Sequence, residues 1–179
     1  MILTIRLGEV LRETLTVRSR DLLTRPTGAA VRSSIEEAIA ATPCPTTLLD
    51  FEAVGLIDFS CADEVVAKLL RRTEADQYVV LLGLDDTQAE AIDHVLARQD
   101  LAVAALPRSG GGGCRVLGRT TPDLIQAFDA LHALGEGNAE RLAPRLGWTL
   151  ERTADALHTL ALHRLVLAAA GTYAPLPLQ

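Results

Sequence analysis

Three short apolar runs, separated by segments of helical spacing, constrain the fold of this chain more than any other feature. The runs cover residues 46–51, 78–84 and 101–106, and each has the length of a strand. The run at 78–84 is nearly continuous, which is typical of a central strand that is covered on both faces. Between the runs, apolar residues recur every three or four positions and predict amphipathic helices. Strands that alternate with helices predict an α/β fold, with helices packed on a mixed or mostly parallel sheet.

The N-terminal residues extend this predicted layer. Residues 2–7 and 13–18 alternate between apolar and polar side chains, which is the period of half-buried strands. Because Gly8 lies near the turn between them, we expect a β-hairpin at the N-terminus. Residues 27–41 have helical spacing, and Thr27 is the expected N-cap of that helix. Two further helices are expected to begin at Ser60 and just behind Asp85.

A run of four glycines separates this layer from the rest of the chain. Ser109 and the glycines after it would match a Walker-type phosphate loop only if Gly-Lys-Ser/Thr opened a helix, and residues 114–117 look like a strand instead. We therefore predict a flexible loop. Residues 1–118 form the predicted α/β domain, and residues 120–179 form a second domain.

The second domain is predicted to consist of helices and a terminal hairpin. Pro122 suits the first turn of a helix, and Asn138 and Thr149 suit the N-caps of two more. The last of these helices is expected to end near residue 165. Two short segments around Gly171 predict a β-hairpin.

The charge and the apolar pattern exclude several classes of protein. The net charge is −6; residues 1–119 hold 13 basic and 17 acidic residues, and residues 120–179 hold four and six. Neither part is therefore an obvious binder of polyanions. No run approaches the roughly 18 apolar residues that span a bilayer, and no basic leader precedes an apolar run. We expect a cytoplasmic protein with no membrane contact.

The cysteines and histidines follow no metal-binding or catalytic pattern. Cys44, Cys61 and Cys114 are far apart and form no CxxC pair, so we expect reduced core residues. The four histidines form no HExxH pattern and are expected on exposed helix surfaces. The sequence contains no nucleophile elbow, metal cluster or nucleotide loop with its lysine. We predict a protein that is not an enzyme and uses no cofactor or metal.

Residues 48–65 (LLDFEAVGLIDFSCADEV) carry the most specific motif of the chain. A buried strand ends in Asp50, a short loop holds apolar anchors, and Asp58-x-Ser60 opens a helix. This segment resembles the STAS domain of anti-sigma-factor antagonists and sulfate transporter tails. It is more similar still to the bacterial STAS-like group, whose segment runs roughly Asp-Phe-x-x-Val…Ser-Phe-Ala-Asp-Glu. The order of strands and helices in residues 1–118 agrees with the fold that this resemblance implies.

The resemblance also implies a phosphorylation switch. In the antagonists, a partner kinase phosphorylates a serine at the start of this helix, which places that role on Ser60 with Asp58 as its acidic neighbour. A helix N-terminus tolerates a phosphate, and the added negative charge can repel or reshape a protein interface. The candidate partner contacts around Ser60 are Phe59, Cys61, Asp63 and Glu64.

Plainer roles for the two switch residues stay open. Ser60 with Asp63 three residues later is close to a capping box, so Ser60 can be an ordinary helix N-cap. Asp58 can be a loop residue that caps backbone amides. Neither role needs phosphorylation.

Residues 137–157 (GNAERLAPRLGWTLERTADAL) form the second informative pattern. A short helix, a short turn and a longer amphipathic helix resemble bacterial winged helix-turn-helix domains, with the trailing hairpin as the wing. DNA binding does not follow from that fold, because DNA readers have a basic face and this domain is acidic. The candidate DNA contacts, whose plainer role is solvated helix charge, are Arg141, Arg145, Arg152 and Arg164.

Together these patterns predict a bacterial regulatory protein. Its STAS-like domain would bind a protein partner, and the resemblance suggests an anti-sigma factor or a serine kinase. Two other classes stay open. One is a transcription regulator that binds DNA through the winged helix while the other domain senses a signal or forms a homodimer. The other is a small-ligand sensor, which a polar pocket in the structure would favour.

Overall fold

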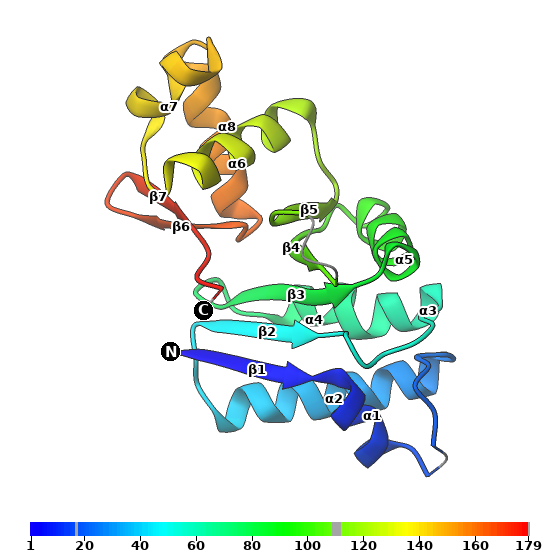
Figure 1. Cartoon of the computed structure of the whole chain (residues 1–179). Helices are drawn as coiled ribbons and strands as arrows, with labels where there is room; N and C mark the ends of the chain where they lie inside the picture. The colour runs from blue at the N-terminus through cyan, green and yellow to red at the C-terminus, as the bar shows by residue number, and fades with distance from the viewer. Residues whose placement is uncertain (17, 109–111, 179) are drawn as a thin grey trace. The chain divides into compact units, whose positions relative to one another are not determined.

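The computed structural model describes every residue except 17, 109–111 and 179. Contacts divide the chain into two compact units, Met1–Arg119 and Thr120–Leu178 (Figure 1).

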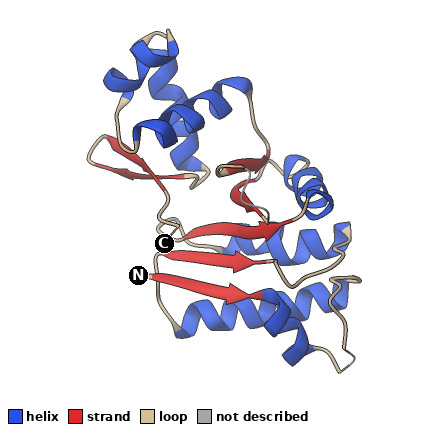
Figure 2. Ribbon diagram, in the orientation of Figure 1, coloured by secondary structure: helices blue, strands red, loops and turns tan. Residues whose placement is uncertain are grey.

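The first unit alternates strands and helices. Its elements in chain order are β1 (Ile2–Arg6), α1 (Leu7–Thr14), α2 (Arg25–Ala41), β2 (Thr46–Asp50), α3 (Phe59–Cys61), the π-helix η1 (Ala62–Ala67), α4 (Lys68–Arg72), β3 (Tyr78–Leu84), α5 (Asp86–Ala97), β4 (Ala102–Pro107) and β5 (Arg115–Gly118). The described strands form a five-stranded sheet in the order β1-β2-β3-β4-β5 (Figure 2). The first four are parallel and β5 is antiparallel to β4. The prediction of an α/β fold with a mixed or mostly parallel sheet is confirmed.

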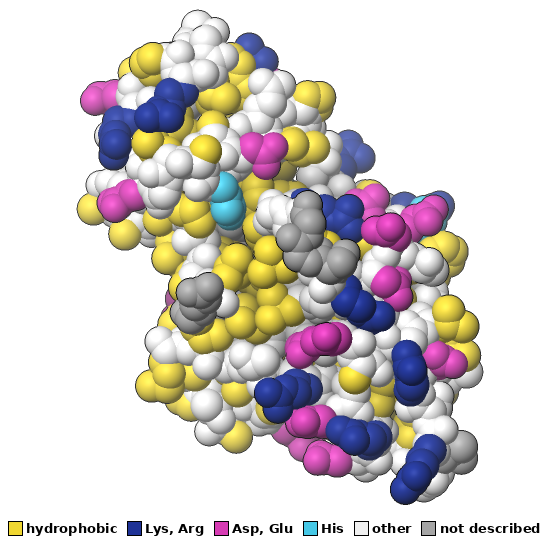
Figure 3. Space-filling view, in the orientation of Figure 1, with side chains coloured by type: hydrophobic (Ala, Val, Ile, Leu, Met, Phe, Trp, Pro, Cys, Tyr) yellow, Lys and Arg dark blue, Asp and Glu magenta, His cyan; other side chains and the backbone are white. Residues whose placement is uncertain are grey.

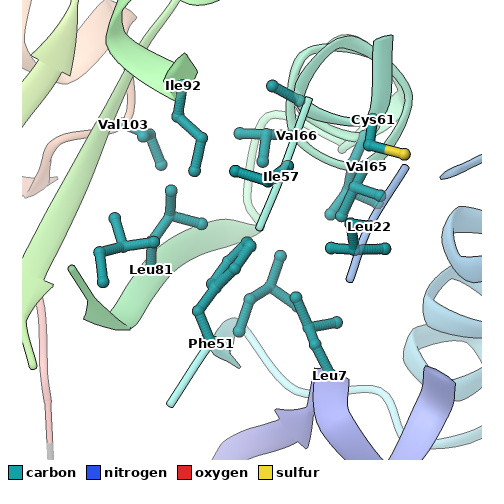
Figure 4. Close-up of a cluster of buried hydrophobic side chains, with 14 of the residues drawn as sticks. Leu7, Leu22, Phe51, Ile57, Cys61, Val65, Val66, Leu81, Ile92 and Val103 are labelled. Carbon is teal, nitrogen blue, oxygen red and sulfur yellow. The ribbon is translucent and has the colours of Figure 1, made fainter. Parts of the chain in front are cut away.

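The core of this unit lies between the sheet and its helices (Figure 4). The strands follow one another across the sheet in chain order. Because crossovers between parallel strands are right-handed, their helices all lie on the same face of the sheet. Leu81 and Val103 of the sheet share one buried cluster with Val66 and Ile92 of the helices, and Phe51 belongs to it with 0% exposure. Burial of each such side chain contributes about 1.5–3 kcal/mol.

The predicted N-terminal hairpin is wrong. β1 pairs in parallel with β2, so that Ile5 lies opposite Leu49, and the chain enters α1 directly after β1. The described part of residues 13–18 forms no strand, and residue 17 lies outside the described residues.

The reason for this error lies in α1. Leu7 and Leu11, four residues apart, both have 0% exposure, so the segment has helical rather than alternating burial. Gly8 is in this helix and not in a turn. A Cβ there would lie 2.6 Å from the Cβ of Ala53, so glycine is needed for close approach of the loop after β2.

The start of α2 differs from the prediction, whereas the start of α5 agrees with it. α2 begins at Arg25 behind Thr24, not behind Thr27, and Pro26 occupies its first turn, where a missing N–H costs nothing. α5 begins behind Asp85, which forms a capping box with the third residue of the helix.

The predicted strand after the glycine run is confirmed as β5. The predicted flexible loop falls mostly on residues 109–111, which lie outside the described residues. Gly112 and Gly113 belong to no helix or strand.

Within its described residues, the second unit consists of helices followed by a hairpin. Its elements are α6 (Pro122–Leu134), α7 (Ala139–Leu146), α8 (Leu150–Leu162), β6 (Val166–Ala169) and β7 (Thr172–Pro175). The predicted caps Asn138 and Thr149 are confirmed, and so is the antiparallel hairpin. α8 ends before residue 165, because Arg164 has a φ of 56° and the chain there leaves the helical conformation.

Candidate functional site

The candidate site lies where the carboxyl end of β2 leads into the helical segment α3–η1–α4. The loop after β2 runs beside the segment that leads into α2. The Leu22 N–H donates to the Leu56 carbonyl oxygen at 2.8 Å, and the Asp58 N–H donates to the Leu22 carbonyl oxygen at 3.0 Å. These backbone hydrogen bonds fix the start of α3 against the segment that leads into α2.

Asp58 caps α3 and ties it to the start of α2. Its Oδ1 accepts the Cys61 N–H at 2.7 Å and the Ser60 hydroxyl at 2.8 Å, and its Oδ2 accepts the Thr24 N–H at 2.9 Å. Burial alone raises the pKa of the Asp58 carboxyl, but the hydrogen bonds from Cys61, Thr24 and Ser60 outweigh it and hold this pKa below its usual value. Asp58 therefore has the plainer of its predicted roles, as an ionised cap.

Ser60 is the second residue of α3 and not its N-cap. The prediction that Ser60 opens the helix as a cap is wrong, because the Asp58 carboxylate already accepts the free N–H of Cys61. The half-buried Ser60 hydroxyl donates to Asp58 instead. A phosphate on Ser60 would gain the field of the helix N-terminus but would replace this hydrogen bond with repulsion between two anions.

Cys61, which we expected among the partner contacts, is buried with 0% exposure. Its thiol donates to the Thr24 carbonyl oxygen at 3.0 Å. Burial, with a smaller contribution from the charge of Asp58, raises the pKa of Cys61 to about 12. The thiol is therefore protonated at neutral pH and is a packing residue, neither a nucleophile nor a direct partner contact.

Glu64, also expected among the partner contacts, is buried at 2% exposure within a cluster of cations. Its Oε1 accepts hydrogen bonds from Arg25 at 2.8 Å and Lys68 at 2.5 Å, and its Oε2 accepts one from Arg32. The two arginines belong to α2, whereas Glu64 belongs to η1. This Glu64 cluster joins the two helices and has no carboxylate surface to offer a partner.

Asp63 lies at the edge of the same cluster. It is half-buried and accepts hydrogen bonds from Arg25 at 2.7 Å and from Gln99 at 2.8 Å. Asp63 and Glu64 both lie in η1, a π-helical stretch of six residues. Such stretches are rare and occur frequently at functional sites.

Phe59 is the exposed member of the predicted contacts. Its side chain is 58% exposed, and its ring stacks on His94 of α5 with a centroid distance of 4.9 Å. A groove of about 400 Å³ is lined by both rings and by Asp58 and Glu90. We call these four residues the Phe59 surface. The Phe59 ring thus forms an exposed apolar edge of this groove.

Sequence reasoning did not find Arg25, Arg32 and His94 as parts of this site. Only Lys68 had a local signal, its i,i+4 spacing from Glu64 on one helical segment. The other three residues come from α2 and α5, and no spacing along the chain links them to the motif.

In the second unit, the charge of Arg152 is already paired. Its guanidinium donates two hydrogen bonds to the Asp123 carboxylate, at 2.9 and 2.7 Å, and lies 4.2 Å from the centroid of the Trp148 ring. These bonds hold the pKa of Asp123 below its usual value. Arg152 is therefore not a free cation for a phosphate.

Of the other three candidate DNA contacts, two lie on α7 and one lies in the turn after α8. Arg141 is exposed on α7 and donates to the Glu136 carbonyl oxygen at 3.3 Å, and Arg145 is exposed near the end of the same helix. Arg164 is half-buried in the turn after α8. On the face that Figure 3 shows, basic and acidic side chains of this unit are interspersed, with no continuous basic surface.

Known proteins do not identify the site. No family model, curated protein or solved structure matches this chain. Among the described residues, no group of three or more His, Cys, Asp or Glu side chains could hold a metal ion. None of the helices in the described part of the chain is long and apolar enough to cross a membrane.

Proposed function

We propose that this chain is a regulatory protein, not an enzyme, whose first unit docks a partner protein at the Phe59 surface. The observation that carries the proposal is Phe59 itself, a ring that is 58% exposed beside a groove. Aromatic side chains of this kind are enriched at the centres of protein interfaces, where they supply much of the binding energy.

The support behind this surface favours tight binding. Asp58 holds the start of α3 through three hydrogen bonds, and the Glu64 cluster holds η1 against α2. A surface that is already ordered loses less conformational entropy on association. By holding η1 against α2, the buried Glu64 carboxylate therefore helps to keep the Phe59 surface ordered.

The groove fits a partner segment with an apolar side chain next to a cation. Ile57 and Ala91 add apolar lining, while the ionised Asp58 and the exposed Glu90 add negative charge. The resemblance of residues 48–65 to STAS-like domains supports an anti-sigma factor or a serine kinase as the type of partner. The free cysteines suit a reducing compartment, and we propose the bacterial cytoplasm.

Ser60 is proposed as the switch of this interface. Ser60→Asp is expected to weaken partner binding about tenfold, because the new carboxylate repels Asp58, which caps α3 and holds the Phe59 surface in place. Ser60→Ala is expected to bind as the wild type does, since Asp58 keeps its two backbone hydrogen bonds. Affinity is measured by calorimetry against the partner isolated from source-cell lysate on the wild-type chain.

The matched control is Ser33→Asp, which adds the same charge at an exposed position of α2. It is expected to leave the affinity unchanged. Equal affinities for Ser60→Asp and Ser60→Ala would remove the switch from the proposal.

The second unit is proposed to make protein contacts, or to form a homodimer, rather than to read DNA. The resemblance of residues 137–157 to a winged helix-turn-helix keeps DNA binding as the alternative. The groove beside α8, however, is lined by Asp123, Glu151 and Asp155, with Arg152 already paired. A DNA reader needs cations where this unit has carboxylates.

We expect the full chain to show no salt-sensitive binding to duplex DNA at low ionic strength. A gel shift over a salt series tests this, because phosphate contacts give affinity that falls steeply with salt. The double variant Glu151→Arg with Asp155→Arg is the positive control, since it turns the exposed start of α8 basic. Salt-sensitive binding by the wild-type chain would favour the transcription-regulator alternative.

A further inference from the structure

A polar cavity lies at the carboxyl ends of the parallel strands of the first unit. It measures about 520 Å³ and is lined by the loops that follow β2, β3 and β4 and by the segment before α2. Loops that a rigid scaffold positions carry a large share of binding residues in proteins. The volume falls within the range of roughly 300–1,000 Å³ that small-molecule sites occupy.

Three arginines line this cavity, and one of them builds its wall. Arg108 donates from Nη2 to the carbonyl oxygens of Phe51, at 2.9 Å, and Val54, at 3.2 Å. Its Nε donates to the carbonyl oxygen of Gly83 at 3.0 Å. These bonds place one positive charge at the meeting point of the strand ends.

The other two arginines, Arg18 and Arg20, are exposed and line the opposite segment. Among the described residues, neither has a carboxylate within ion-pair distance. Arg18 and Arg20 therefore bring two guanidinium groups to this lining, in a chain whose net charge is −6. Ser19 and Thr87 add hydroxyl groups to the same lining.

The two carboxylates of the lining are already in use. Asp21 accepts the Leu56 N–H at 2.8 Å, and Asp85 accepts the Gln88 N–H at 2.8 Å as the cap of α5. A Cβ at Gly55 would collide with the Asp21 carboxylate, so this glycine lets Asp21 seat against the loop. Asp85 also forms an ion pair with Arg108, at 3.7 Å. Arg18 and Arg20 are thus the charged groups that remain to bind a ligand.

We infer that this cavity binds a small molecule that carries a phosphate group, with its size near that of a mononucleotide. Guanidinium groups match phosphate in geometry and charge, and hydroxyl groups donate further hydrogen bonds to its oxygens. Leu56, which is 58% exposed, supplies an apolar surface for the rest of the ligand. The site uses none of the four residues of the Phe59 surface, so the inference stands independently of the partner.

The test is calorimetric titration of the full chain with inorganic phosphate, ribose 5-phosphate and AMP. Ribose and adenosine serve as the uncharged counterparts. At least one of the two phosphate-bearing sugars is expected to bind saturably, and the uncharged counterparts are not. Each of the substitutions Arg18→Gln and Arg20→Gln is expected to raise the Kd of the phosphate-bearing sugar that binds about tenfold, because each removes one charge-assisted hydrogen bond.

Arg71→Gln is the matched control, because it removes one exposed arginine from α4, outside the cavity. It is expected to leave the Kd unchanged, and none of the three variants is expected to change the unfolding temperature without ligand. Absence of saturable binding, equal binding by the uncharged counterparts, or equal affinity of the Arg18→Gln, Arg20→Gln double variant and the wild type would each overturn the inference. Binding of inorganic phosphate with no gain from ribose 5-phosphate or AMP would overturn the small-molecule assignment.

Discussion

Glu64→Ala is expected to lower the free energy of unfolding by about 3–5 kcal/mol, the cost of removing one partner from a buried ion pair. Glu64 is 2% exposed and receives hydrogen bonds from Arg25, Arg32 and Lys68. Arg32 is itself only 9% exposed, so its guanidinium would remain in the interior without its principal anion. The loss combines this uncompensated charge with the packing of η1 against α2.

Urea denaturation of the wild type and the variant measures this change. Glu37→Ala, at an exposed position of α2, is the control and should stay within about 0.5 kcal/mol of the wild type. Replacing Glu64 and Arg32 together by methionine should recover part of the loss, because the charges leave the interior as a pair. A loss below about 1 kcal/mol for Glu64→Ala would contradict a structural role for the cluster.

The pH dependence of this difference has a definite sign. Burial raises the pKa of the Glu64 carboxyl, but the hydrogen bonds from Lys68 and Arg25 and the charge of Arg32 outweigh it and hold this pKa below its ordinary 4.5. A carboxyl whose pKa is lower in the folded state adds stability above its unfolded pKa and loses it as the pH falls through the folded pKa. Urea curves at falling pH should therefore show the gap between wild type and Glu64→Ala closing below about pH 4.5.

Features that depend on neighbouring residues were predictable from the sequence. The apolar run at 78–84 became β3 with the predicted limits, and Asn138 and Thr149 cap the helices assigned to them. A cap needs only a side-chain oxygen and a backbone N–H three residues later. Such signals lie within one short window of sequence.

The N-terminus shows why other features were not predictable. The alternation at 2–7 indicated a strand correctly, but nothing local says whether its partner is the next segment or a distant one. The partner is β2, about forty residues later, and this pairing leaves 7–14 free to form α1. A parallel pair requires a crossover, which a hairpin interpretation excludes.

The candidate site contains features of both kinds, some set by neighbouring residues and some set by residues distant in the sequence. The motif predicted that Asp58 and Ser60 meet at a helix start, and their side chains are hydrogen-bonded. It could not show that Glu64 points inward to cations from α2, or that Phe59 points outward to His94, because both facts depend on how α2 and α5 pack. Residue type alone suggested the reverse, since a glutamate is usually exposed and a phenylalanine usually buried.

Phe59→Ala is expected to raise the Kd for the partner at least about 30-fold, the effect of removing a residue at the centre of an interface. Because the ring is 58% exposed in the free protein, the same substitution should change the free energy of unfolding little. Titration with the purified partner measures the first quantity, and urea denaturation measures the second. A large change in affinity with a small change in stability separates a docking role from a structural one.

Ile125→Ala is the matched control, because it truncates another exposed apolar side chain, 43% exposed on α6 of the second unit. The Kd of His94→Ala should lie between those of Phe59→Ala and Ile125→Ala, because the substitution removes the side chain on which the Phe59 ring stacks but leaves the ring itself. An unchanged Kd for Phe59→Ala would show that the partner binds another part of the protein. An equal loss for Ile125→Ala would show that general surface hydrophobicity, and not this ring and its groove, holds the partner.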